Sequence, residues 1–210
     1  MHLTFDGQNF HSICDKLAKK DKHLYSIIKQ FGYPPIWTRK ASFQTLIHII
    51  LEQQVSLASA RAALIKLKER IGFVTPAKLL ALSDDELKAC YFSRQKIVYA
   101  KCLANAIVTK QIILKTINDL GDAEIRHQLK TIKGIGDWTV DVYLLFALQR
   151  TDIFPLGDLA MVNALKEVKQ LPKETRQEEL LKLAEKWRPY RSIATMLFWH
   201  HYIQKRGIKV

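Results

Sequence analysis

The chain has 210 residues, 48% of them hydrophobic, which is enough for one large globular domain or two small ones and excludes a disordered protein. Its 33 Lys and Arg residues outnumber 20 Asp and Glu residues, for a formal net charge of +13. This excess favours a polyanionic partner, with nucleic acid first. An anionic membrane is the rival, but neither a polybasic amphipathic helix nor a lipidation signal supports it. Charge alone also fits a merely soluble basic protein.

Three cysteines, Cys14, Cys90 and Cys102, are too widely spaced for the common zinc or iron–sulfur patterns. Their odd number suggests a reducing compartment. The first residues do not resemble a signal peptide, and no apolar stretch approaches the ~18 residues of a spanning helix. We therefore expect an intracellular protein, cytoplasmic if bacterial and nuclear if eukaryotic, with no membrane partner and no bound metal.

Helical periodicity dominates the chain in order. An apolar stripe with i, i+3, i+4, i+7 spacing follows an expected N-cap at Ser42 and runs to Val55. A second stripe covers 57–71 and ends at Gly72. Further N-terminal caps are expected at Thr75, Ser83, Ser93 and Asp122.

The later helices are expected from about Asp137 to Leu148, from Asp158 onward, near 174–187 and near 192–206. Sustained strand alternation, internal repeats and low-complexity segments are absent from the sequence. The pattern predicts an all-α fold with roughly ten short helices.

Two breaks divide the helical pattern, one at 32–35 and one at 150–157. We predict a central helical subdomain of residues 41–150. A terminal subdomain would combine residues 1–40 with 151–210. The active cleft is expected between the two.

The segment Gly134-Ile135-Gly136 lies between two helical patterns, so a helix–hairpin–helix motif is expected over about 123–149. A phosphate needs several amides aimed at one point, which a helix N-terminus provides, and glycines let the backbone approach closely. Lys133 and Thr139 can add a charge and a hydroxyl contact. Such contacts hold DNA without reading its sequence. The alternative is a plain C-cap followed by a new helix.

Asp158 directly precedes a helical segment and is expected to cap it. Capping is compatible with catalysis, because a helix N-terminus favours the ionised carboxylate and such a carboxylate stabilises an oxocarbenium-like transition state. The competing acids are Asp137, Asp141 and Asp152.

Residues 134–139 followed by Asp158 resemble the helix–hairpin–helix DNA glycosylases, in particular the DNA-3-methyladenine glycosylase II (alkylpurine) branch. Three further segments are similar to that branch: 50–56 with its Gln-Gln-Val-Ser end, 87–96, and 187–194 with Trp-Arg-Pro-Tyr-Arg-Ser-Ile-Ala. The resemblance therefore covers about 42–205.

The resemblance implies a base excision repair enzyme, a monomer that acts on double-stranded DNA containing damaged bases. It would flip out alkylated purines, of the 3-methyladenine and 7-methylguanine type, and hydrolyse their N-glycosidic bond. Asp158 falls at the catalytic position. Trp138 stands where bifunctional relatives carry a lysine nucleophile, which implies a monofunctional enzyme without lyase activity. No cofactor is implied, with a structural monovalent cation at the hairpin kept as an option.

Aromatic residues can hold a cationic base. By resemblance, Trp138 and Trp199 match pocket positions, with Tyr143 and Tyr190 as further candidates; core packing is the alternative for each. By the same resemblance, Gln54 matches the wedge that fills the space of the flipped base, with a solvated helix end as the alternative. The DNA-contact candidates are Gln53, Gln54, Ser93, Arg94, Lys96, Lys133, Gly134, Gly136, Thr139 and Arg191.

Two other functions remain open from the sequence. One is a non-catalytic DNA-binding protein that uses the same hairpin to hold phosphates. The other is a glycosylase for an oxidised or deaminated base.

Overall fold

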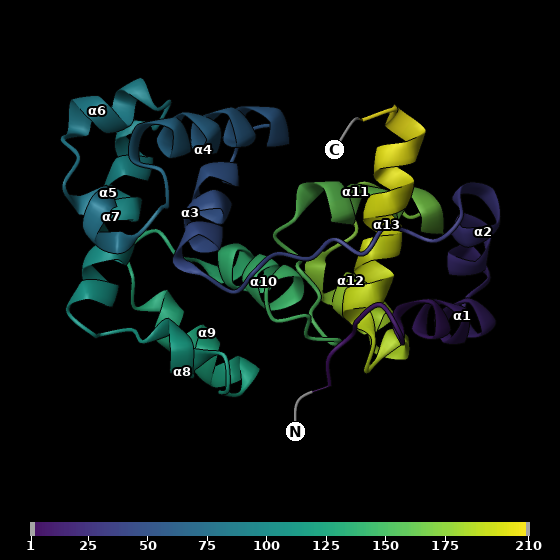
Figure 1. Ribbon diagram of the computed structural model, residues 1–210. Helices are drawn as coiled ribbons and strands as arrows, with labels where there is room; N and C mark the ends of the chain where they lie inside the picture. Colours follow the sequence, from purple (N-terminus) through teal and green to yellow (C-terminus); the bar gives the residue numbers. More distant parts are fainter. Residues whose placement is uncertain (1–2, 209–210) are drawn as a thin grey trace. The chain divides into compact units, whose positions relative to one another are not determined.

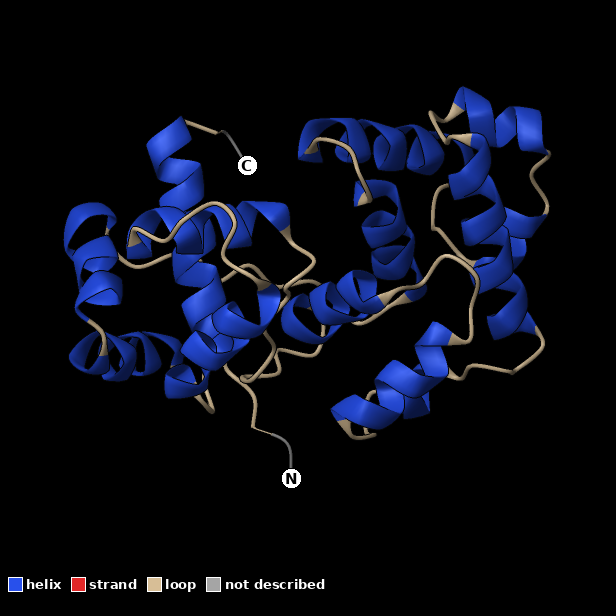
Figure 2. Ribbon diagram, turned by 180° about the vertical axis from the view of Figure 1, so that it is seen from behind, coloured by secondary structure: helices blue, strands red, loops and turns tan. Residues whose placement is uncertain are grey.

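A computed structural model describes residues 3–208 of the chain (Figure 1). These residues form 13 α-helices and one 3-10 helix and contain no strand (Figure 2). An isolated antiparallel bridge joins Thr4 and Arg150. The predicted all-α class is confirmed. The helices exceed the expected ten because several are very short, such as α8 (Leu114–Ile117). Within the described range, none combines the length and apolar composition needed to span a membrane.

The chain divides into two compact units. The terminal unit joins the two ends of the sequence, Met1–Thr38 and Leu144–Val210, and the central unit is Arg39–Tyr143. The second division falls inside helix α10 (Asp137–Phe146). The boundaries predicted from sequence, after residues 40 and 150, lie close to this division and stay predictions.

The central unit is built around α7, which packs against α3, α5 and α6 (Figure 1). The buried face of α7 carries small and apolar side chains, among them the fully buried Ala100, Leu103 and Ala104. The small alanine side chains let the neighbouring helices approach closely. The helices of this unit before α10 are α3 (Phe43–Glu52), α4 (Leu57–Ile71), α5 (Pro76–Leu80), α6 (Asp84–Ala89), α7 (Arg94–Val108), α8 and α9 (Asp122–Lys130).

Side-chain caps begin most of these helices where the sequence places them. Ser42, Thr75 and Ser93 each accept a backbone N–H three residues on, and Ser83 forms a full capping box with Glu86. The prediction for Asp122 is wrong. Gly121 has the extended backbone of the N-cap, and Asp122 is already the first residue of α9.

The terminal unit is built around α13 (Arg191–Arg206), drawn in yellow in Figure 1. It packs against α1, α2 and α11, and every residue from Ser192 to His200 is buried. A helix covered on all sides can carry apolar residues around its whole circumference. The other elements here are α1 (Phe10–Lys20), α2 (Lys22–Phe31), α11 (Leu159–Lys169), α12 (Gln177–Ala184) and the 3-10 helix η1 (Glu185–Trp187).

A buried ion cluster fixes the frame of this unit. The Asp21 side chain is 1% exposed and accepts hydrogen bonds from Lys169 Nζ at 2.6 Å and Trp187 Nε1 at 2.8 Å. Lys186 Nζ lies 2.9 Å from Asp21 Oδ2. Burial alone would raise the pKa of Asp21, but these donors together hold it well below its usual range. Asp21 thereby ties the start of α2 to the end of α11 and to η1.

Candidate active site and nucleic-acid interface

The predicted hairpin is present in the central unit between α9 and α10. Ile132 and Ile135 are buried on either side of the turn and anchor it to the core. Gly134 has φ +93°, in the region that favours glycine, so this residue makes the sharp turn. Gly136 is exposed, and its carbonyl accepts the N–H of Val140 at 3.1 Å, which makes it the cap of α10. The free end of α10 therefore opens to solvent at Gly136.

The ring of Tyr99 supports the hairpin from α7. A Cβ added at Gly134 would lie 2.0 Å from Tyr99 Cγ, whereas one added at Gly136 would meet no atom within 4 Å. Position 134 thus requires glycine for two reasons, the close packing of Tyr99 and the positive φ angle. Gly136 faces open space. The sequence analysis missed Tyr99, because 35 positions separate it from the turn it supports.

Ion pairs lock the two hairpin helices together. Lys130 and Arg126 of α9 both bind Asp137 in the first turn of α10, and Arg126 also binds Asp141. The hydrogen bond from Lys130 is the main cause of a lowered pKa at Asp137, whereas burial raises the pKa of Asp141. Both acids, rivals of Asp158 by sequence, are thus held by cations. Lys133 is exposed beside the turn, as a phosphate contact requires.

In the terminal unit, Asp158 is held by two N–H donors. Its Oδ1 accepts the backbone N–H of Met161 at 2.8 Å, the predicted capping bond of α11, and the indole Nε1–H of Trp199 at 2.9 Å. The indole is stacked on Phe146, with ring centroids 5.2 Å apart and planes 20° apart. Packing therefore fixes the donor that orients the carboxylate. The site combines a helix N-terminus, an aromatic wall and a half-buried acid.

The remaining rival acid, Asp152, is consumed by salt bridges. Its carboxylate binds Arg188 at 2.8 Å and Arg191 at 2.7 Å. The Oδ1 atom of Asp158 accepts the N–H groups of Met161 and Trp199 described above.

Residues 47–189 match the family of HhH-GPD superfamily base excision DNA repair proteins. The chain belongs to this superfamily. It is 30% identical to DNA-3-methyladenine glycosylase 1 of Schizosaccharomyces pombe, over 94% of this chain and 92% of the relative. It is also 30% identical to an alkylbase DNA glycosidase-like protein of the same yeast, over 87% and 89%. A solved S. pombe 3-methyladenine DNA glycosylase in complex with abasic DNA superposes with a TM-score of 0.83 at 29% identity, covering 90% of this chain and 95% of that one.

Within the segment 187–194 of this superfamily member, Trp187 and Ser192 pack and bond inside the terminal unit. Trp187 is fully buried beside Asp21, and the Ser192 hydroxyl donates to Arg150 O at 2.6 Å and accepts from Ile153 N at 2.9 Å. These bonds fasten the start of α13 to the segment that leads to Asp158. Arg191, predicted to contact DNA, has a side chain only 12% exposed and paired with Asp152. Its described bonds therefore serve the same fastening.

Three further predicted contacts are engaged inside the central unit. The Thr139 hydroxyl is buried, with the residue 1% exposed, and accepts from Gln53 Nε2 at 3.0 Å, so it does not face a phosphate. Lys96 Nζ donates to Leu51 O at 2.6 Å, and desolvation lowers the pKa of its ammonium. Gln53 binds the hairpin. By contrast, the sequence candidates Gln54, Ser93 and Arg94 are exposed, with Ser93 also capping α7.

The four aromatic candidates have different surroundings. Tyr143 is fully buried; desolvation raises its pKa to about 12, and its hydroxyl donates to Asn118 Oδ1 at 3.1 Å. Its burial argues for core packing and against contact with a base. Trp138 and Tyr190 are half-buried, and Trp199 is 8% exposed and spends its N–H on Asp158.

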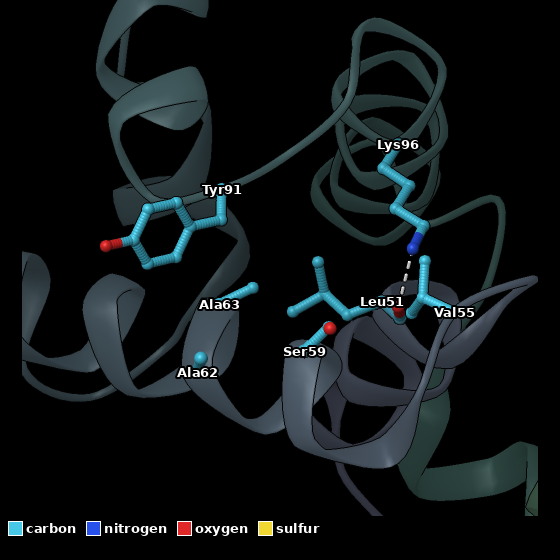
Figure 3. A pocket seen from close by; sticks show the side chains of 7 residues that line it. All are labelled: Leu51, Val55, Ser59, Ala62, Ala63, Tyr91 and Lys96. Atoms are coloured by element: carbon cyan, nitrogen blue, oxygen red, sulfur yellow. Dashed lines mark hydrogen bonds between the residues drawn. The ribbon is translucent and has the colours of Figure 1, made fainter.

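A pocket of about 280 Å³ opens in the central unit beside the turn between α3 and α4 (Figure 3). Figure 3 shows Lys96 reaching across to the carbonyl of Leu51, with the ring of Tyr91 on the opposite wall. Tyr91 has φ +66° and is exposed. The pocket is lined by Leu51, Val55, Ser59, Ala62, Ala63, Tyr91 and Lys96. No carboxylate is among these lining residues.

Proposed function

We propose that this protein is a monofunctional DNA glycosylase that hydrolyses the N-glycosidic bond of alkylated purines, such as 3-methyladenine and 7-methylguanine, flipped out of duplex DNA. The observation that carries the proposal is Asp158, held at the N-terminus of α11 by Met161 N–H and Trp199 Nε1–H. The names of the yeast relatives support the substrate class. A net charge of +13 supports a DNA partner.

The chemistry follows from the charges involved. Alkylation at a ring nitrogen makes the purine cationic, so the bond to the sugar breaks with its electron pair passing to the base. The sugar becomes an oxocarbenium ion, which the Asp158 carboxylate stabilises. Water then adds to the sugar carbon and loses a proton, with Asp158 as the acceptor. Because Trp138 occupies the position of the lysine nucleophile, no amine is supplied there for a Schiff base.

The partners and setting belong to the same proposal. The enzyme acts as a monomer on double-stranded DNA, in the cytoplasm of a bacterium or the nucleus of a eukaryote. The hairpin turn at 134–136, which is exposed at Gly136, and Lys133 grip phosphates, and Gln54 fills the space of the flipped base. No cofactor is proposed, with a structural monovalent cation at the hairpin kept as the one option.

Base release is the direct test. Duplexes carrying 3-methyladenine or 7-methylguanine should lose the free base and gain an abasic site, whereas borohydride should trap no covalent adduct. Matched duplexes with an oxidised or a deaminated purine complete the panel. If free base is released only from the duplexes with an oxidised or a deaminated purine, the substrate is that class of lesion and not an alkylated purine. Tight binding of every duplex without any release would favour the non-catalytic DNA-binding protein.

The hairpin turn is tested by Gly136→Asp. The new side chain fits, since no atom lies within 4 Å of its Cβ, and it adds a negative charge where the phosphate would bind. Affinity for damaged and undamaged duplexes should fall alike, by about tenfold, and the salt dependence of binding should become shallower. Gly136→Asn, similar in shape but uncharged, is the control for the charge. A loss confined to damaged DNA would show that the turn does not hold the backbone.

A further inference from the structure

The turn between α3 and α4 presents Gln54 on a constrained backbone. Gln53 ends α3, and its N–H is bonded to Ile50 O at 3.3 Å. Gln54 follows with φ +57°, a conformation that L side chains rarely adopt, and it is exposed. Ser56 then caps α4 by accepting the N–H of Ser59 at 3.2 Å. The bonds on both sides of Gln54 therefore constrain the backbone that carries this exposed side chain.

Gln53 turns its own side chain toward the hairpin. Its Nε2 donates to Gly134 O at 2.9 Å and to Thr139 Oγ1 at 3.0 Å. A backbone carbonyl only accepts, so the nitrogen of the amide must face the hairpin, and its two N–H groups serve the two partners. Thr139 is buried, which makes this bond costly to break. A single side chain thus joins the turn of Gln54 directly to the turn of Gly134.

Helix α7 supports each of the two turns separately. Lys96 Nζ donates to the carbonyl of Leu51 near the end of α3, and the Tyr99 ring lies against Gly134. Lys96 and Tyr99 are three positions apart and share one face of the helix. This face carries both turns, and the amide of Gln53 spans the gap between them. The arrangement links the phosphate-gripping turn and the wedge turn through defined polar bonds.

We propose that Gln53 is a positioning residue that couples the wedge turn to the hairpin, so that gripping the DNA backbone at 134–136 and inserting Gln54 occur in one register. Misplacement by about 1 Å can cost a catalyst some 10²-fold in rate, which makes such a coupling valuable. The inference deepens the proposed function and rests on it. It also replaces the direct DNA contact that the sequence analysis assigned to Gln53.

Gln53→Met tests the coupling. Methionine has a similar length and volume but cannot donate to Gly134 O or Thr139 Oγ1. Single-turnover release of 7-methylguanine should fall about tenfold, a typical coupling between residues in contact. Affinity for undamaged duplex should change less than about twofold, because Tyr99 still supports the hairpin. Gln111→Met is the matched control: Gln111 also donates to a threonine hydroxyl, that of Thr131 at 3.3 Å, but at the surface, and full activity is expected.

A double-mutant cycle separates positioning from direct contact. If Gln53 acts through Gln54, then Gln53→Met should add little to the loss already caused by Gln54→Ala. Fully additive losses, or an equal loss of affinity for undamaged duplex, would overturn the inference. Fluorescence of 2-aminopurine beside an abasic-site analogue gives a second readout without catalysis. Wild type should raise the signal more than Gln53→Met does, and equal signals would reject the coupling even if the proposed hydrolysis failed.

Discussion

Asp158→Asn is expected to abolish base release while leaving the fold and DNA binding intact. The rate of 7-methylguanine release under single-turnover conditions should fall by roughly 10³-fold, within the range for removing an acid–base or charge-stabilising group. The reason is that an amide has no negative charge to stabilise the oxocarbenium ion. It also cannot take the proton from water.

We expect this substitution to remove the negative charge while the fold is kept. Asparagine caps helices as well as aspartate does, and its Oδ1 can still accept the N–H groups of Met161 and Trp199. We expect the melting temperature to change by no more than about 2 °C. Asp84→Asn, at an exposed acid in the first turn of α6, is the control for the chemical change. Undiminished release by Asp158→Asn would remove the carboxylate from the mechanism.

Gly134→Ala is expected to damage the hairpin far more than Gly136→Ala. At Gly134 the added methyl group would lie 2.0 Å from the Tyr99 ring on a backbone with φ +93°. Overpacking and the unfavourable angle together should cost about 2–5 kcal/mol, or roughly 5–15 °C in melting temperature. Affinity for any duplex should fall with it. At Gly136 the cost should not exceed about 1 kcal/mol.

The two causes at Gly134 can be separated by removing the ring. In a Tyr99→Ala background, Gly134→Ala should lose the overpacking part of its cost and keep the part due to the backbone angle. The two parts of the cost are measured by thermal melting and by the affinity for undamaged duplex, each with and without the Tyr99 ring. Equal costs for Gly134→Ala with and without the Tyr99 ring would mean that the hairpin moves away from α7.

Interactions between residues close in the sequence allowed the helix caps and the hairpin turn of this protein to be predicted. Helix caps such as Ser42, Ser83 and Asp158 act within three or four residues, so their spacing alone predicted them. The turn at 134–136 was visible because only glycine suits a sharp turn before a helix N-terminus. The all-α class and the hairpin followed from these signals, whereas the superfamily was inferred from the resemblance of several motifs to known glycosylases.

Contacts between distant segments required the tertiary structure. The Tyr99 ring against Gly134, the amide of Gln53 on the hairpin and the indole of Trp199 on Asp158 all join residues far apart in the chain. The hydrophobic periodicity of a sequence predicts which face of a helix is apolar. It does not predict which hydrogen-bond partner a given polar side chain will have. For this reason Thr139 and Arg191, read as DNA contacts, and Tyr143, read as a pocket residue, proved to be engaged or buried within the protein. The sequence determined the local elements and singled out Asp158 as the proposed reacting acid, and packing decided which side chains hold them in place.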